Sequence, residues 1–185
     1  MVGRFAVVYD ANVLVPAPVR DLLLRVAEAG LVRAHMSDDI LDEVERVLVE
    51  TFSMPEAKAQ RLRGHLERAL DDGVLERGRY GDLGPVGLPD PDDEHVVAAA
   101  RAAGAQAIVT LNLKDFPKER LAAFGVEALH PDDFLLDLID LHPLRIARLV
   151  EEQAAALKNP PKTYDEVVEA LARTVPESAG RLRRR

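Results

Sequence analysis

The sequence predicts an α/β fold in which helices cover both faces of a parallel sheet, with a helical extension at the C-terminal side. Short aliphatic and β-branched runs alternate with stretches of helical periodicity up to residue 130. These runs are apolar throughout, which is typical of strands buried on both faces. From residue 131 onward the pattern is helical only. We therefore expect an α/β sheet unit over residues 1–130 and a helical extension over 131–185.

The first quarter of the chain contains two predicted strands and two predicted helices. The run FAVVY at residues 5–9 predicts the first strand. A Leu-rich stretch at 18–29 precedes a glycine, so we expect a helix that ends there. Residues 31–36 form the second candidate strand. Ser37 can cap a helix and is followed by two acids, which predicts a helix to about residue 50.

The middle of the chain is predicted to return to the sheet after two more helices. Residues 55–70 have helical periodicity, and 74–76 form a short extended piece. Gly and Pro residues punctuate 81–91, which indicates a loop. An Ala-rich helix opens at Asp92 and closes at Gly104.

The remaining predicted strands cover 106–111 (QAIVTL) and 125–129, with a turn and short helix between them. Three helices follow, at about 132–141, 143–157 and 163–173. The Pro160–Pro161 break suggests that the residues beyond it form an appendage rather than core. The arginines at 181 and 183–185 are interpreted as a solvated face or a disordered tail.

Composition excludes several classes of function. The net charge of −8 excludes a protein that coats nucleic acid with a basic surface. It does not exclude a nuclease, because an acidic pocket that binds divalent cations can act on phosphates. The absence of cysteine excludes disulfides, thiolate metal sites and cysteine nucleophiles. The apolar runs are too short for a membrane span, so a cytoplasmic protein without a membrane partner is expected.

Two acids lie where open α/β sheets gather their reactive groups, beyond the carboxyl ends of the strands. Asp10 follows the first predicted strand directly. Asp115 lies in the turn after the strand that ends near Leu111. Each of these acids, taken alone, is more often a turn former than a functional residue.

Two further acids come from helices. On the 37–50 helix, Glu43 lies at one edge of the apolar stripe and Glu45 at the opposite edge, so geometry prefers Glu43 only weakly. The side chains of Asp42 and Arg46 are expected to point further away from the apolar stripe. Asp93 begins the inward stripe of the Ala-rich helix, and its alternative role is an N-cap. Converging carboxylates repel one another, so either their pKa values rise or a cation enters, with Mg²⁺ or Mn²⁺ favoured by oxygen ligands.

Four segments together resemble the PIN-domain ribonucleases, and among them the toxins of VapBC-type toxin–antitoxin pairs. The resemblance covers roughly residues 5–130 and is carried by the order and spacing of YDANVL at 9–14, ILDEVERVL at 40–48, DPDDEHVVAAA at 90–100 and IVTLNLKDF at 108–116. It implies that the catalytic acids are Asp10, Glu43, Asp93 and Asp115. It also implies auxiliary roles for a second set of residues, namely Asn12, Ser37, Asp90, Asp92, Thr110 and Asn112.

The chain departs from many relatives at one position. They have an acid two residues after the threonine, where this chain has Asn112. The fourth acid is therefore assigned to Asp115, as in other relatives, and Asn112 to contact with metal or water. Thr110, Ser37 and Asn12 would orient the carboxylates by hydrogen bonds.

The resemblance implies a metal-dependent endoribonuclease in which Asp10, Glu43, Asp93 and Asp115 hold Mg²⁺ or Mn²⁺. Similar toxins are homodimers inhibited by a cognate antitoxin, whose arginines can pair with such acids. A basic side chain would bind neighbouring phosphates of the RNA, and the sequence does not say which. The five histidines have no ligand spacing, so none is assigned to metal.

Other functions compete with this one. A PIN-like module that has lost a metal, because Asn112 replaces an acid, would bind RNA or a partner without cutting. A phosphoacceptor receiver needs a pair of acids after the first strand, and Asn12 does not supply the second. A phosphatase with Asp10 as nucleophile would need its general acid at that same position.

Overall fold

The centre of the molecule is a five-stranded sheet with all strands parallel, in the order β3-β2-β1-β4-β5. The computed structural model describes residues 5–184. The strands are β1 (Ala6–Tyr9), β2 (Arg33–Ser37), β3 (Val74–Leu75), β4 (Ala107–Val109) and β5 (Glu127–Leu129). This architecture confirms the predicted α/β class.

The direction in which strands are added reverses beside β1. The chain first builds outward through β2 and β3, and then returns to place β4 on the other side of β1. Val8 is therefore paired with His35 of β2 and with Ile108 of β4. The connections after β1 and β4 leave the sheet in opposite directions, which creates a crevice at the carboxyl ends of these strands.

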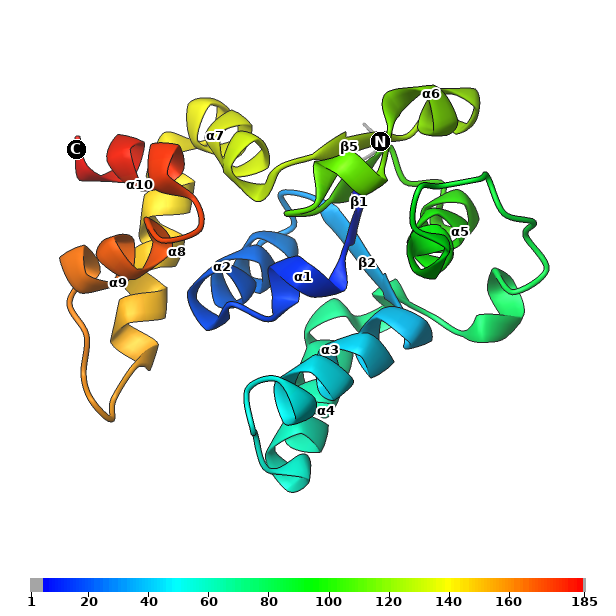
Figure 1. Ribbon diagram of the computed structural model, residues 1–185. Helices are drawn as coiled ribbons and strands as arrows, with labels where there is room; N and C mark the ends of the chain where they lie inside the picture. The colour runs from blue at the N-terminus through cyan, green and yellow to red at the C-terminus, as the bar shows by residue number, and fades with distance from the viewer. Residues whose placement is uncertain (1–4, 185) are drawn as a thin grey trace.

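Helices cover both faces of the sheet, as predicted (Figure 1). α5 (Glu94–Ala103) packs on one face, and α2 (Ala17–Glu28) lies on the other. The other helices of this part are α1 (Ala11–Leu14), α3 (Asp38–Glu50), α4 (Glu56–Leu70) and α6 (Lys118–Leu121). Within residues 5–184, no helix is both long enough and apolar enough to span a membrane.

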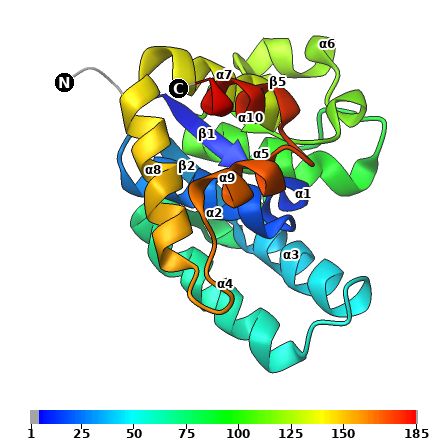
Figure 2. The same cartoon turned by 90° about the vertical axis from the view of Figure 1, so that its left-hand side faces the viewer.

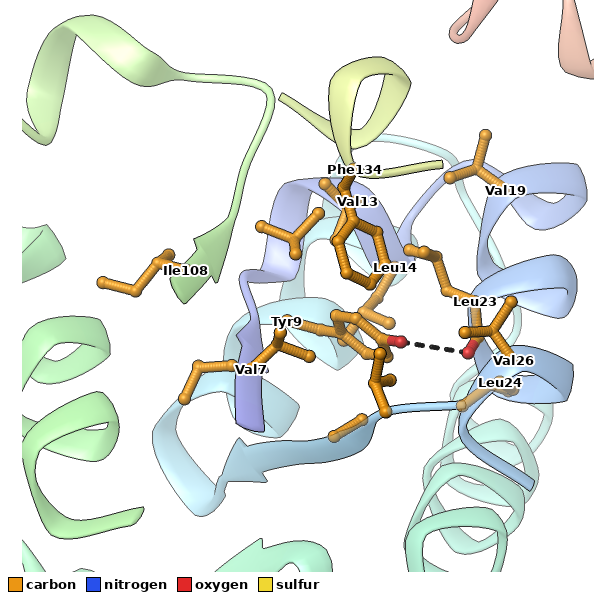
Figure 3. Close-up of a cluster of buried hydrophobic side chains, with 14 of the residues drawn as sticks. Val7, Tyr9, Val13, Leu14, Val19, Leu23, Leu24, Val26, Ile108 and Phe134 are labelled. Atoms are coloured by element: carbon orange, nitrogen blue, oxygen red, sulfur yellow. Dashed lines mark hydrogen bonds between the residues drawn. The ribbon is translucent and has the colours of Figure 1, made fainter. Parts of the chain in front are cut away.

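Tyr9 joins the sheet to the helices on the α2 side (Figure 3). Its side chain is fully buried, and its hydroxyl donates a hydrogen bond of 3.1 Å to the carbonyl oxygen of Leu23. The ring of Phe134, from α7 (Pro131–Leu141), meets the Tyr9 ring edge-on at a centroid distance of 6.3 Å. Burial of two aromatic rings in this contact stabilises the joint between sheet, α2 and α7.

The C-terminal helices form a further layer outside α2, on the side away from the sheet (Figures 1 and 2). They are α8 (Pro143–Ala156), α9 (Tyr164–Leu171) and α10 (Pro176–Arg183). The prediction that residues beyond Pro160–Pro161 are an appendage outside the core was wrong. Val168, Leu171 and Ala179 are completely buried within the main hydrophobic cluster, because both helices present an apolar face inward.

Of the two interpretations of the terminal arginines, the solvated face holds for Arg181 and Arg183, which are exposed on α10, and the disordered tail does not. The guanidinium of Arg181 pairs with the carboxylate of Asp140 on α7 at 2.5 Å. Arg185 lies outside the described residues.

A buried carboxylate holds α10 against α7. Asp132, in the first turn of α7, is 6% exposed. Its carboxylate accepts hydrogen bonds from the backbone N–H groups of Glu177 (2.9 Å) and Ser178 (2.8 Å), at the start of α10. The hydroxyl of Ser178 in turn donates to the carbonyl oxygen of Asp132 at 3.0 Å. Asp132 thus neutralises the positive end of the α10 dipole and satisfies its free donors.

Candidate functional site

Asp10 follows β1 directly and lies at the crevice between β1 and β4. Its side chain is 3% exposed, and its Oδ1 accepts a hydrogen bond from the N–H of Ala11 at 2.7 Å, which caps α1. Its Oδ2 accepts from the side-chain amide of Asn12 at 2.6 Å and from the hydroxyl of Thr110 at 2.7 Å. These bonds fix the orientation of the carboxylate from three sides.

Thr110 links the ends of β1 and β4. It is completely buried after β4, and its Oγ1 accepts hydrogen bonds of 3.0 Å from the Asn12 amide and from the N–H of Asn112. Asn12 also accepts from the N–H of Leu111 at 2.9 Å. The predicted auxiliary residues Asn12 and Thr110 therefore belong to one hydrogen-bond network with Asp10.

Glu43 extends from α3 into the same region. Its Oε2 lies 3.5 Å from Nε2 of His95 on α5, and its side chain is 33% exposed. Glu45 lies at the other edge of the apolar stripe, and its Oε2 is 3.7 Å from Nη1 of Arg63 on α4. Of the two acids that helical geometry left open, only Glu43 is among the described residues that line the acidic pocket defined below.

Ser37 lies at the start of α3, beside the site. It is completely buried, and its Oγ accepts a hydrogen bond of 3.3 Å from the N–H of Ile40. This bond caps the start of α3, the helix that carries Glu43.

Three acids lie close enough to share a cation. One carboxylate oxygen from each of Asp90, Asp93 and Asp115 lies within 4.8 Å of the other two. Asp90 and Asp93 bracket the 3₁₀ turn before α5, and Asp115 ends a similar turn after β4. The side-chain amide of Asn112 donates to Oδ2 of Asp115. Asp90, predicted only as an auxiliary residue, is thus grouped with two of the predicted catalytic acids.

The segment before Asp90 is fixed by Glu94 from the first turn of α5. Its carboxylate accepts hydrogen bonds from three successive backbone N–H groups, those of Val86 (2.8 Å), Gly87 (2.7 Å) and Leu88 (2.7 Å). These bonds lower the pKa of Glu94 despite the opposing effect of burial. This role of Glu94 could not be predicted from the sequence, because a carboxylate that accepts hydrogen bonds from backbone N–H groups leaves no residue pattern.

These residues surround a pocket of about 560 Å³, which we call the acidic pocket. Most of its lining side chains are carboxylates, and they come from β1, α3 and the start of α5. The lining residues are Asp10, Asn12, Asp39, Asp42, Glu43, Arg46, Asp90, Asp92, Asp93, His95 and Asn112. Asp115 adjoins the pocket through its contacts with Asn112 and Asp93.

Asp93 experiences the electrostatic repulsion of this group most clearly. Burial, followed by the negative charges of Asp10, Asp90, Asp115 and Glu43, raises its pKa from 3.8 to about 6. Burial also raises the pKa of Asp10, and the hydrogen bond from Thr110 partly opposes that rise. Without a cation, carboxylates in this arrangement repel one another when they are all ionised. A bound cation would relieve this repulsion.

This pKa predicts how metal-free stability depends on pH. Folded Asp93 keeps its proton to about pH 6, whereas the unfolded side chain releases it near 3.8. The folded state therefore binds more protons between these values, and raising the pH through this window costs stability. In EDTA at pH 7.5, we expect Asp93→Asn to melt roughly 1–3 °C above the wild type.

The comparison of melting curves from pH 4 to 7.5 checks this expectation. The advantage of Asp93→Asn should shrink toward pH 4, where the wild-type side chain is protonated in the folded state. An equal difference at every pH would mean that the Asp93 charge is not repelled by its neighbours.

His95 was missed by sequence analysis. It lines the acidic pocket from α5, and its Nδ1 is buried without a hydrogen-bond partner among the described residues. Burial tends to lower the pKa of His95, but the hydrogen bond and charge of Glu43 raise it overall, with help from Asp39 and Asp10. The approach of α3 to α5 creates this pair, and no local spacing in the sequence could reveal it.

The fold and the pocket define an α/β protein with a carboxylate-rich site at the carboxyl edge of its sheet. The chain belongs to the PIN domain family, because residues 6–114 match the family model described as PIN domain. Residues 131–184 match a second model, described as VapC50 C-terminal domain. The family resemblance inferred from the four sequence segments is confirmed.

One curated relative is the protein of Mycobacterium tuberculosis (strain ATCC 25618 / H37Rv) named "Putative ribonuclease VapC50". It is 42% identical to this chain over 92 residues, which are 50% of this chain and 54% of the relative. The match thus spans about half the length of the curated relative. No solved structure matches the chain.

Proposed function

We propose that this chain is a metal-dependent endoribonuclease that cleaves RNA phosphodiesters, acting as the toxin of a VapBC-type toxin–antitoxin pair. The observation that carries the proposal is the convergence of Asp10, Glu43 and Asp93 on one pocket at the carboxyl edge of a PIN-family sheet. The relative named as a ribonuclease supports the choice of RNA as substrate.

The donor set of the pocket fits a hard divalent cation. Asp10, Glu43, Asp93 and Asp115 would hold Mg²⁺ or Mn²⁺ directly or through water, with Asp90 beside Asp93 and Asp115. The raised pKa of Asp93 reflects negative charge that a cation would neutralise. When bound, the metal ion supplies Lewis-acid activation of water for attack on a phosphodiester.

The surrounding residues of the chain keep the carboxylates in place. Thr110 and Asn12 hold the carboxylate of Asp10 by hydrogen bonds of 2.7 and 2.6 Å. Asn112 donates to Asp115, and the imidazole of His95 faces Glu43. Fixed ligand orientations reduce the reorganisation needed when cation and substrate bind, which favours catalysis.

We assign the catalytic unit to residues 1–130 and a helical extension to residues 131–185. The family matches over 6–114 and 131–184 support this division. The partners that we propose are a second copy of the chain and a cognate antitoxin with arginines for the acidic pocket, all in the cytoplasm.

The proposal is tested by incubating the purified chain with an end-labelled single-stranded RNA in Mg²⁺, in Mn²⁺ and in EDTA. We expect internal cleavage with either metal. We expect no cleavage in EDTA, because EDTA removes the cation that would activate water for attack on the phosphodiester. RNA that is bound but remains intact in both metals would instead indicate a PIN-like binding module. A single-stranded DNA of the same sequence serves as the substrate control.

A further inference from the structure

A single guanidinium lies at the rim of the acidic pocket, among the described residues that line it. It belongs to Arg46 of α3, which follows Glu43 by three positions and therefore lies about one helical turn away on a neighbouring face. The helical periodicity predicted an outward position for Arg46 on this helix. Its side chain is indeed 60% exposed, but it borders the pocket.

The other arginines near this side of α3 are already paired with carboxylates. Arg77 binds Asp39 at 2.7 Å and also contacts Asp42. Arg63 of α4 contacts Asp42 and binds Glu67 at 3.0 Å. Each of these guanidiniums would have to give up at least two close ion pairs before it could bind a ligand.

Arg46 is much less constrained. Its closest ionic partner in the structure is Glu50, one turn further along α3, at 3.7 Å, with the Glu50 side chain 65% exposed. An exposed pair at this distance contributes little to stability, so the guanidinium can exchange Glu50 for another anion at low cost.

The acidic pocket repels the phosphates of a polyanionic substrate, because most of its lining side chains are carboxylates. Asp39 and Asp42 are already paired with arginines that do not line the pocket, whereas Arg46 is the one guanidinium among its described lining residues. A guanidinium can bind a phosphate through two parallel hydrogen bonds. We propose that Arg46 binds an RNA phosphate next to the bond that is cut, an inference that rests on the proposed function.

The chain offers a matched control for this residue. Arg148 of α8 is 69% exposed and forms the same kind of i,i+4 pair, with Glu152 at 3.3 Å. Arg46→Gln and Arg148→Gln therefore remove the same charge from similar helical environments, but only the first lies at the acidic pocket. Arg46→Lys keeps the charge and loses the planar pair of donors.

The first measurement is the fluorescence anisotropy of a labelled single-stranded RNA, with Ca²⁺ in place of Mg²⁺ and with RNA integrity checked on a gel. We expect Arg46→Gln to bind about tenfold more weakly than wild type, with Arg46→Lys between them and Arg148→Gln unchanged. The slope of log K against log salt should fall by about 0.7, as for one lost phosphate contact on a single strand.

The second measurement separates substrate binding from metal binding. In Mn²⁺, KM of Arg46→Gln should rise about tenfold while kcat stays within about threefold of the wild type. Mn²⁺ binding without RNA, measured by calorimetry, should be unchanged or slightly tighter in Arg46→Gln. A loss of Mn²⁺ binding would contradict a role confined to the substrate.

The outcomes distinguish this inference from the nuclease proposal. If the wild type cuts RNA and both glutamine variants bind RNA equally well, the role of Arg46 is overturned and the nuclease stands. If the wild type binds RNA without cutting and Arg46→Gln alone binds weakly, the phosphate contact stands and the nuclease does not. A wild type that binds no RNA in any condition overturns both.

Discussion

Asp93→Asn is expected to lower metal-dependent RNA cleavage at least about 100-fold while the chain remains folded. Asp93 borders the acidic pocket together with Asp10 and Glu43, and it shares a second group of oxygens with Asp90 and Asp115. It is thus the carboxylate common to both groups. Asparagine has the same shape but neither the charge nor the second oxygen that a hard cation prefers.

Asp93 is a cleaner test than Asp10. The carboxylate of Asp10 accepts hydrogen bonds from Ala11, Asn12 and Thr110. In Asp10→Asn, the new NH₂ group would face one of these donors and could not accept its hydrogen bond. Lost activity in Asp10→Asn could then reflect a disturbed connection between β1 and β4. Asp93 makes no side-chain cap bond at the start of α5, which leaves its charge as the main property removed.

The measurement is single-turnover cleavage of a labelled RNA in Mn²⁺, with Mn²⁺ affinity from calorimetry and folding from circular dichroism. Weaker Mn²⁺ binding should accompany the loss of cleavage. Asp93→Asn with wild-type cleavage rates and wild-type Mn²⁺ affinity would remove Asp93 from the metal site.

Glu43→Gln and Glu45→Gln are expected to differ by about 100-fold in cleavage rate, although they lie two residues apart on α3. Glu43 faces His95 inside the acidic pocket, so its loss removes a negative ligand. Glu45 faces Arg63 at 3.7 Å on the side toward α4. Its loss weakens one contact of a partly exposed ion pair and should leave the rate within about twofold of wild type.

The two variants control for each other, because both exchange a half-buried glutamate for its amide within one helix. Cleavage rates in Mn²⁺ and melting temperatures in EDTA are measured side by side. Greater loss of cleavage in Glu45→Gln would show that the functional edge of α3 is the one toward α4.

Much of the fold could be predicted because its elements carry long or strongly periodic signals. The apolar run of β1 and the amphipathic stretch of α3 are both present close to their expected bounds. Gly104, expected to end the Ala-rich helix, adopts the left-handed conformation with φ of 60° after α5. These signals are local, so the sequence of each segment is enough to predict its element.

The elements that were missed depend on tertiary contacts. α1 has only four residues and begins at the cap supplied by Asp10, which is too short for a periodic pattern. α10 is largely polar, and its buried residues are Ser178, Ala179 and Leu182. Asp132, more than forty positions earlier, accepts hydrogen bonds from its first turn, and no local sequence pattern indicates such a partner.

The candidate site divides in the same way. Asp10 and Asp93 could be predicted from their places at the end of a strand and the start of a helix. The choice of Glu43 over Glu45 needed the family resemblance, because helical geometry alone left both edges open. His95 and Arg46 border the pocket only because the fold brings α5 close to α3, and this proximity is a property of the folded chain.

The hydrogen bonds between Asp132 and the start of α10 also order events during synthesis. A ribosome translates every acid of the site, up to Asp115, well before it reaches Ser178, which lies 46 positions after Asp132. Until then the carboxylate of Asp132 lacks the two backbone N–H groups from which it accepts hydrogen bonds in the folded chain. The contact that joins α10 to α7 can therefore form only after every acid of the site has been translated.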